Sequence, residues 1–190
     1  CIRDSLKLLL YYHPEARNAA DQEALVDELV LACRRYDMPL FLEPLSFVID
    51  RKAKKLSSAE RREVVIETAR RLSPKGIDVL KAEFPLDSVA EPDERIWAEA
   101  CAELTDASAA PWILLSAGVD YETYLRQVRV ACCSGASGVA AGRAIDGQRD
   151  RVDAGLRIDV HRVHLRAGRA VAEAPLAAGH RPGRGIEEAN

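Results

Sequence analysis

Five short runs of apolar residues, each bounded by proline, glycine or charge, constrain the fold of this chain more than any other feature. Near-continuous apolar runs of this length are typical of strands that are buried on both faces. Amphipathic stretches with apolar residues at steps of three and four lie between the runs, as expected for helices. Successive runs begin roughly 25 to 40 residues apart, which predicts βαβ units in a parallel sheet. The runs are Leu6–Tyr12, Leu40–Leu45, Ile77–Phe84, Trp112–Ser116 and Gly138–Ala141.

The composition fits a globular protein. The chain has 190 residues, of which 48% are hydrophobic and 30% are charged. Its formal net charge of −3 gives no reason to expect nucleic acid or an anionic membrane as a partner. No apolar run reaches the roughly 18 residues of a transmembrane helix. The five cysteines form neither a disulfide nor a zinc pattern, so we expect reduced thiols and a cytoplasmic protein.

The character of the sequence changes toward its C-terminal end. Residues 143–190 hold nine arginines and seven acidic residues, but no lysine and no aromatic residue. We therefore predict that residues 1–145 form the folded α/β part and that residues 146–190 form a weakly ordered tail rich in Arg, Ala and Gly. His161 and His164 lack an acidic or thiol partner at a suitable spacing, so we expect no metal site there.

Lys81 is the sharpest candidate for a catalytic residue. It lies within an apolar run, where burial disfavours the charged ammonium and makes the neutral amine available. A neutral amine can attack a carbonyl and form a Schiff base. Glu83 follows two residues later and would lie on the same face of a strand. A lysine that pairs with Glu83 or reaches solvent is therefore the structural alternative.

Glu43 and Lys7 also interrupt apolar runs. Glu43 lies near the end of its run, and functional residues of parallel α/β proteins gather at the carboxyl ends of strands. A carboxylate in this place suits general acid or base catalysis. A structural ion pair between Glu43 and Lys7 explains the two charges equally well.

Small residues follow the last two predicted strands. Ser116 and Gly118 follow the fourth run, and Gly142 and Arg143 follow the fifth. Backbone N–H groups of such loops can hold a phosphate, and Arg143 would add a charge and a forked donor. Because barrel phosphate sites are often built from the loops after strands seven and eight, the two loops together predict a phosphate site.

Five segments occur in the order of a known family: KLLLYY (7–12), PLFLEPL (39–45), VLKAEFP (79–85), PWILLSAGV (111–119) and AGRAI (141–145). They resemble the class I tagatose 1,6-bisphosphate aldolase family, which also contains the closely similar sulfofructosephosphate aldolases. The resemblance covers residues 4–145. It implies an α/β fold, a partial (β/α)8 TIM barrel. The five parallel strands would correspond to strands four to eight, with the intervening helices.

The resemblance also assigns roles to the candidate residues. It implies that Lys81 forms the Schiff base with the ketose carbonyl, that Glu43 transfers protons, and that Lys7 lies near the hydroxyls of the substrate. The implied partner is a phosphorylated ketose, and because the protonated imine is the electron sink, no metal or other cofactor is implied. The residues that match the phosphate site of the family are Ser116, Gly118, Gly142 and Arg143.

The chain departs from the family in two ways. Strands one to three of the barrel are absent, and Asp146 stands where family members carry an aromatic residue. We expect the chain, which does not begin with Met, to be a piece of a longer protein. A reading-frame change near residue 146 would explain the unusual tail, which resequencing of the locus tests.

Three alternatives stay open. The first is a sulfofructosephosphate aldolase, and the second is a truncated barrel fragment without catalytic activity. The third is a complete flavodoxin-like binding domain, which is disfavoured because no glycine-rich loop follows Tyr12. A five-stranded part of a barrel leaves two unpaired sheet edges, so we also expect a homo-oligomer or aggregation.

Overall fold

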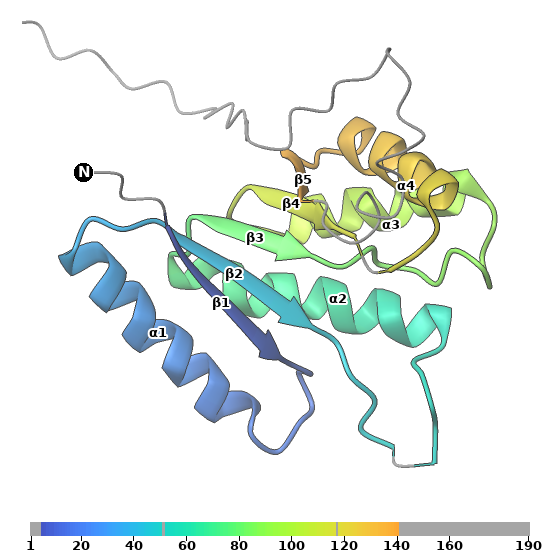
Figure 1. Ribbon diagram of the computed structural model, residues 1–190. Coiled ribbons are helices and arrows are strands. Elements are labelled where there is room, and N and C mark those ends of the chain that lie inside the picture. The colour runs from blue at the N-terminus through green and yellow to red at the C-terminus, as the bar shows by residue number, and fades with distance from the viewer. Residues whose placement is uncertain (1–4, 51, 117, 141–190) are drawn as a thin grey trace, which may run out of the picture.

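The computed structural model describes residues 5–50, 52–116 and 118–140. Within these residues, five parallel strands form one sheet in the order β1-β2-β3-β4-β5, and helices alternate with them along the chain (Figure 1). The strands are β1 (Leu6–Tyr11), β2 (Leu40–Leu45), β3 (Val79–Ala82), β4 (Trp112–Leu115) and β5 (Gly138–Ala140). The helices are α1 (Ala19–Arg35), α2 (Ser58–Leu72), the short η1 (Ser73–Lys75), α3 (Glu94–Ala107) and α4 (Tyr121–Cys133). The predicted α/β fold with parallel strands is confirmed.

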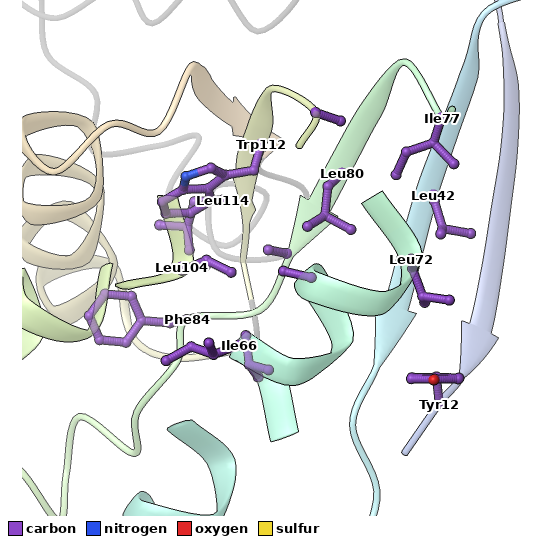
Figure 2. Close-up of a cluster of buried hydrophobic side chains, with 14 of the residues drawn as sticks. Tyr12, Leu42, Ile66, Leu72, Ile77, Leu80, Phe84, Leu104, Trp112 and Leu114 are labelled. Atoms are coloured by element: carbon purple, nitrogen blue, oxygen red, sulfur yellow. The ribbon is translucent and has the colours of Figure 1, made fainter. Parts of the chain in front are cut away.

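One face of the sheet, here called the helix face, holds the apolar core. The strand register places Leu8, Leu42, Leu80 and Trp112 in one row across four strands. Leu42, Leu80 and Trp112 pack in one cluster with residues of the helices, such as Leu104 of α3 (Figure 2), and Leu8 packs against this cluster. Burial of this apolar surface is the main favourable contribution to folding.

The opposite face, here called the inner face, carries the alternate residues of the same strands. The register aligns Lys7 with Phe41 and Val79, and Lys81 with Ile113. None of these five residues belongs to the core cluster of the helix face, although Val79 and Ile113 are buried. Because successive side chains of a strand point to opposite faces, the charged residues of the strands can share one surface without entering the core.

Capping side chains fix where three of the helices begin. Ser57 and Glu60 form a capping box at the start of α2, in which each side chain accepts the backbone N–H of the other residue. The side chains of Asp93 and Asp120 cap α3 and α4, and each accepts one backbone N–H from the first turn of its helix. In a βα unit the helix begins beyond the carboxyl end of the strand, so these caps order the edge of the sheet where the candidate site residues lie.

Strand β3 is shorter than the apolar run Ile77–Phe84 that predicted it. Before β3, Asp78 binds Leu40 twice: its backbone N–H donates to the carbonyl of Leu40 at 3.0 Å, and its carboxylate accepts the backbone N–H of Leu40 at 2.8 Å. Beyond Ala82 the chain turns toward Pro85, which has no N–H to donate to a ladder. An apolar run therefore overstated the strand by two residues at each end.

No helix in the described ranges is both long enough and apolar enough to cross a membrane. All the residues after β5, which include the predicted tail, His161 and His164, lie outside the described residues.

Candidate active site

Three strands bring Lys7, Glu43 and Lys81 into direct contact on the inner face. The Nζ of Lys7 donates to Oε2 of Glu43 at 2.7 Å. The Nζ of Lys81 lies 3.0 Å from the other carboxylate oxygen, Oε1. Glu43 thus lies between two lysines and binds each through a different oxygen.

The register of the ladder explains this contact. Leu42 pairs with Leu80, so the next residues along each strand, Glu43 and Lys81, lie side by side on the inner face. Lys7 is aligned with Phe41, one inner-face position before Glu43, and its long side chain reaches Glu43 diagonally. Two adjacent parallel ladders are therefore sufficient to assemble the three charges.

The three side chains differ in their exposure. The side chain of Glu43 is 9% exposed and that of Lys81 is 19% exposed, whereas that of Lys7 is 52% exposed. Burial by itself would raise the pKa of Glu43, but the hydrogen bonds and positive charges of Lys7 and Lys81 outweigh it, and the pKa is lowered below its ordinary value of 4.5. Glu43 is therefore an ionised carboxylate at neutral pH.

Glu83 does not join this cluster, contrary to the prediction that Glu83 and Lys81 share a face. Because β3 ends at Ala82, the chain has already turned at Glu83, and its carboxylate lies toward α2. There Oε2 accepts the backbone N–H of Ser46 at 2.6 Å, and Oε1 lies 3.5 Å from the guanidinium of Arg61. The alternative pairing of Lys81 with Glu83 is thus wrong, and the pairing of Lys7 with Glu43 is correct.

No pattern in the sequence indicated the contacts that Ser46 and Arg61 make with Glu83. Ser46, the residue after β2, binds Glu83 through its own backbone N–H, and a backbone donor leaves no signal in the sequence. Arg61 is one of several arginines on α2, and only the packing of that helix on the sheet shows which of them faces Glu83.

The first predicted phosphate loop begins at the carboxyl end of β4. Ser116 directly follows β4 and is half-buried, and Gly118 is exposed. Gly118 has a φ of +78°, in the left-handed region that favours glycine, and the space where a Cβ would lie is open. Both residues lie at the same edge of the sheet as Lys81 and Glu43, because all these strands are parallel. Gly142 and Arg143 lie outside the described residues.

Within the described ranges, no group of three or more His, Cys, Asp or Glu side chains lies close enough together to hold a metal ion. The charged side chains that meet at the site are those of Lys7, Glu43 and Lys81.

Comparison with known protein families shows to which family the chain belongs. The family described as DeoC/LacD family aldolase matches residues 4–146. The chain belongs to the DeoC/LacD aldolase family. This membership confirms the resemblance found in the sequence.

Curated relatives of the chain include tagatose 1,6-diphosphate aldolases of two bacteria. The chain is 30% identical to the protein of Listeria monocytogenes over 158 residues, which cover 74% of this chain and 47% of the relative. It is 34% identical to the protein of Streptococcus agalactiae over 161 residues, with 74% and 49% covered. The chain thus spans about half the length of the curated relatives that it matches.

Solved structures of similar fold include fructose-1,6-bisphosphate aldolases. A Schiff-base-forming fructose-1,6-bisphosphate aldolase has a TM-score of 0.57 and 20% identity, with 77% of this chain and 53% of that chain covered. The fructose-bisphosphate aldolase of Slackia heliotrinireducens has a TM-score of 0.55 and 19% identity, with 74% and 42% covered. The shared arrangement confirms that the five strands of this chain form part of a TIM barrel.

Proposed function

We propose that this chain is the catalytic part of a class I aldolase that cleaves tagatose 1,6-bisphosphate to dihydroxyacetone phosphate and glyceraldehyde 3-phosphate. The contact of Lys81 and Lys7 with the two oxygens of Glu43, on the inner face of a DeoC/LacD aldolase, is the observation that carries the proposal. The names of the curated relatives support the choice of tagatose 1,6-bisphosphate as substrate.

Lys81 is the proposed nucleophile. Its amine attacks C2 of the ketose, the carbonyl oxygen leaves as water, and a protonated imine remains between Nζ and C2. Removal of the proton from the C4 hydroxyl then breaks the C3–C4 bond and releases glyceraldehyde 3-phosphate. The electron pair of that bond moves to the imine nitrogen and gives an enamine, which is protonated at C3 and hydrolysed to dihydroxyacetone phosphate.

Glu43 and Lys7 are proposed to manage the protons of these steps. Lys81 has to lose a proton before it attacks, and the carboxylate of Glu43 is within hydrogen-bond distance as an acceptor. After the proton has moved from Nζ of Lys81 to Oε1 of Glu43, Oε2 still accepts the hydrogen bond from Lys7, so the buried carboxyl group keeps a partner. Lys7 is the most exposed of the three and has the freedom to reach the hydroxyls of a substrate.

Ser116, Gly118, Gly142 and Arg143 are proposed to bind the phosphate on the dihydroxyacetone half. The open space and left-handed backbone at Gly118 support this role, since an anion can approach such a backbone closely. We further propose that the barrel wall beyond β1 and β5 has to be supplied, by a longer chain or by another copy, before substrate is held at both ends.

Covalent trapping tests the proposal directly. The full chain is incubated with tagatose 1,6-bisphosphate or dihydroxyacetone phosphate, sodium borohydride reduces any imine to a stable amine, and peptide mass spectrometry locates the adduct. We expect the adduct on Lys81, with none in Lys81→Arg and an unchanged yield in Lys55→Arg. Lys55 is an exposed lysine that pairs with Asp87 at 2.7 Å, away from the cluster.

Two results contradict this function. One is an adduct on another lysine with Lys81 unmodified, and the other is loss of trapping when a chelator is added. Parallel incubations with fructose 1,6-bisphosphate and 6-deoxy-6-sulfofructose 1-phosphate show which ketose is preferred. All three share the same phosphorylated half, so a difference in trapping comes from the other half of the molecule.

A further inference from the structure

The carboxyl ends of β2 and β3 are joined by a side chain. The ladder between these strands aligns Phe41 with Val79 and Leu42 with Leu80, and both pairs lie before the level of Glu43. Beyond that level, Oε2 of Glu83 accepts the backbone N–H of Ser46 at 2.6 Å. A charged hydrogen bond of this length is among the stronger ones in proteins.

Pro44 makes the position of the end of β2 depend more strongly on the bond between Ser46 and Glu83. It follows Glu43 directly and has no backbone N–H, so the end of β2 has one donor fewer with which to bind a neighbouring strand. On the other side, the backbone N–H of Tyr12 donates to the carbonyl of Leu45 at 2.9 Å and ties β2 to the segment after β1. Tyr12 and Glu83 thus hold the end of β2 from its two sides.

Arg61 fixes the orientation of Glu83 from the helix face. Its guanidinium lies 3.5 Å from Oε1 of Glu83, while Oε2 is directed to Ser46. Glu83 is buried beside a small cavity of about 10 Å³ between α2 and the sheet, and a buried carboxylate is costly without polar partners. Its position therefore depends on the two polar contacts.

From these contacts we infer that Glu83 is a positioning residue of the active site. It acts through the backbone of Ser46 and holds the end of β2 so that Glu43 stays against Lys81. This role rests on the proposed function, because it serves the Schiff-base chemistry of Lys81. Glu83 itself touches α2 and the β2–α2 loop, and it lies outside the Lys7–Glu43–Lys81 cluster.

The pKa of Glu43 reports on this position, and its sign separates the two explanations. If Glu83 holds Glu43 against Lys81, removal of Glu83 moves the Glu43 carboxylate away from the Lys81 amine. The pKa of Glu43 then rises toward its ordinary value of 4.5. If Glu83 is only a nearby negative charge, its removal relieves repulsion, and the pKa of Glu43 falls. A residue that only stabilises the fold leaves this pKa unchanged.

The experiment uses the full chain labelled with ¹³C at the glutamate carboxyl groups. NMR titration follows Glu43, whose signal is assigned by its loss in Glu43→Gln. We expect the pKa of Glu43 to rise in Glu83→Ala, which removes the acceptor of the Ser46 N–H, and also in Ser46→Pro, which removes the N–H donor and leaves the charge of Glu83 in place. A proline at 46 favours an extended residue before it, which Leu45 in β2 already is.

Glu103→Ala is the matched control. It removes another ion pair to α2, in which Arg62 lies 2.6 Å from Glu103, and Glu103 makes no contact with the Ser46 N–H. We expect no change in the pKa of Glu43 in this variant. An unchanged or lowered pKa in Glu83→Ala, or an equal rise in Glu103→Ala, would overturn the proposed role.

Borohydride trapping of the same variants separates the two proposals. With the unmodified chain trapped at Lys81, we expect Glu83→Ala to slow the trapping about tenfold, with the half-saturating ketose concentration changed by less than about twofold, because the reacting groups are misplaced and the phosphate site is not. If the unmodified chain is not trapped at all, the proposed function fails, and the titration still decides whether Glu83 positions Glu43.

Discussion

The two faces of the sheet are built from alternate residues of the same strands, but they have different tasks. Leu80 on the helix face is 1% exposed and packs in the apolar core. Lys81, the next residue, lies on the inner face and contacts Glu43 at 3.0 Å. The comparison shows that a parallel strand can separate stability from chemistry by one step along the chain, since neighbouring side chains never share a face.

The largest effect is expected for the chemistry of the inner face. Lys81→Arg keeps the positive charge beside Glu43 but removes the only primary amine at that position, so we expect borohydride trapping to fall by about a thousandfold or more. Thermal unfolding should change little, because Lys81 is outside the apolar core. A large drop in the melting temperature would break the proposed separation of the two faces.

The neighbouring residue should show the reverse result. Leu80→Ala removes a buried side chain of the helix face, and we expect the free energy of unfolding to fall by about 2–5 kcal/mol. Urea unfolding followed by circular dichroism measures this change. A loss below about 1 kcal/mol would mean that this row of the helix face contributes little to stability.

The ion cluster should make the stability of the chain depend on pH. The pKa of Glu43 is lower in the folded protein than in the unfolded chain, because the two lysines outweigh the effect of burial. Glu43 therefore stabilises the fold above its ordinary pKa of 4.5, and this contribution is lost as the pH falls through the lower folded-state value.

Comparison with Glu43→Gln isolates this contribution from that of the other carboxylates. We expect the unfolding free energy of the unmodified chain to drop more steeply below pH 4.5 than that of the variant, in urea titrations at several pH values. Parallel curves for the two proteins would show that the contacts with Lys7 and Lys81 do not stabilise the folded state.

The smallest effect on stability is expected at Tyr11, in contrast to its neighbour Tyr12. Tyr11 is 61% exposed on β1, whereas Tyr12 is fully buried and donates to Glu23 at 2.6 Å. Tyr11→Ser should change the unfolding free energy by less than about 0.5 kcal/mol, and Tyr12→Ala should destabilise by about 3–5 kcal/mol. Thermal and urea unfolding measure both.

Tyr11→Ser also tests whether the exposed β1 side of the sheet promotes association. Tyr11 lies on β1, an edge strand of the described sheet, and an exposed aromatic residue there favours contact with another chain. If copies of the chain associate there, size-exclusion chromatography should show a smaller assembly for the variant. An unchanged elution volume would place any association elsewhere.

Much of the fold could be predicted because its signals are local. Apolar runs and amphipathic stripes identified all five described strands and the helices between them. The bounds of β3 were wrong by two residues at each end, because Asp78 bonds to Leu40, which lies 38 residues earlier in the chain, and because the turn at Glu83 depends on contacts with Ser46 and Arg61.

The candidate site was predicted less completely. Charges inside apolar runs singled out Lys7, Glu43 and Lys81, since such residues are costly to bury without partners. The sequence left open whether Lys81 pairs with Glu83, and that alternative was wrong. The contribution of Ser46 was not detectable, because a backbone donor has the same chemistry in every residue except proline.

By itself, the sequence determined which elements form, the family to which they belong and which charges interrupt the strands. Only the tertiary structure decided that Glu43 lies between two lysines and that Glu83 turns to α2. The physical reason is the range of the interactions. Side-chain alternation follows from the geometry of a single strand, whereas the register between strands is set by hydrogen bonds and packing among segments more than 30 residues apart.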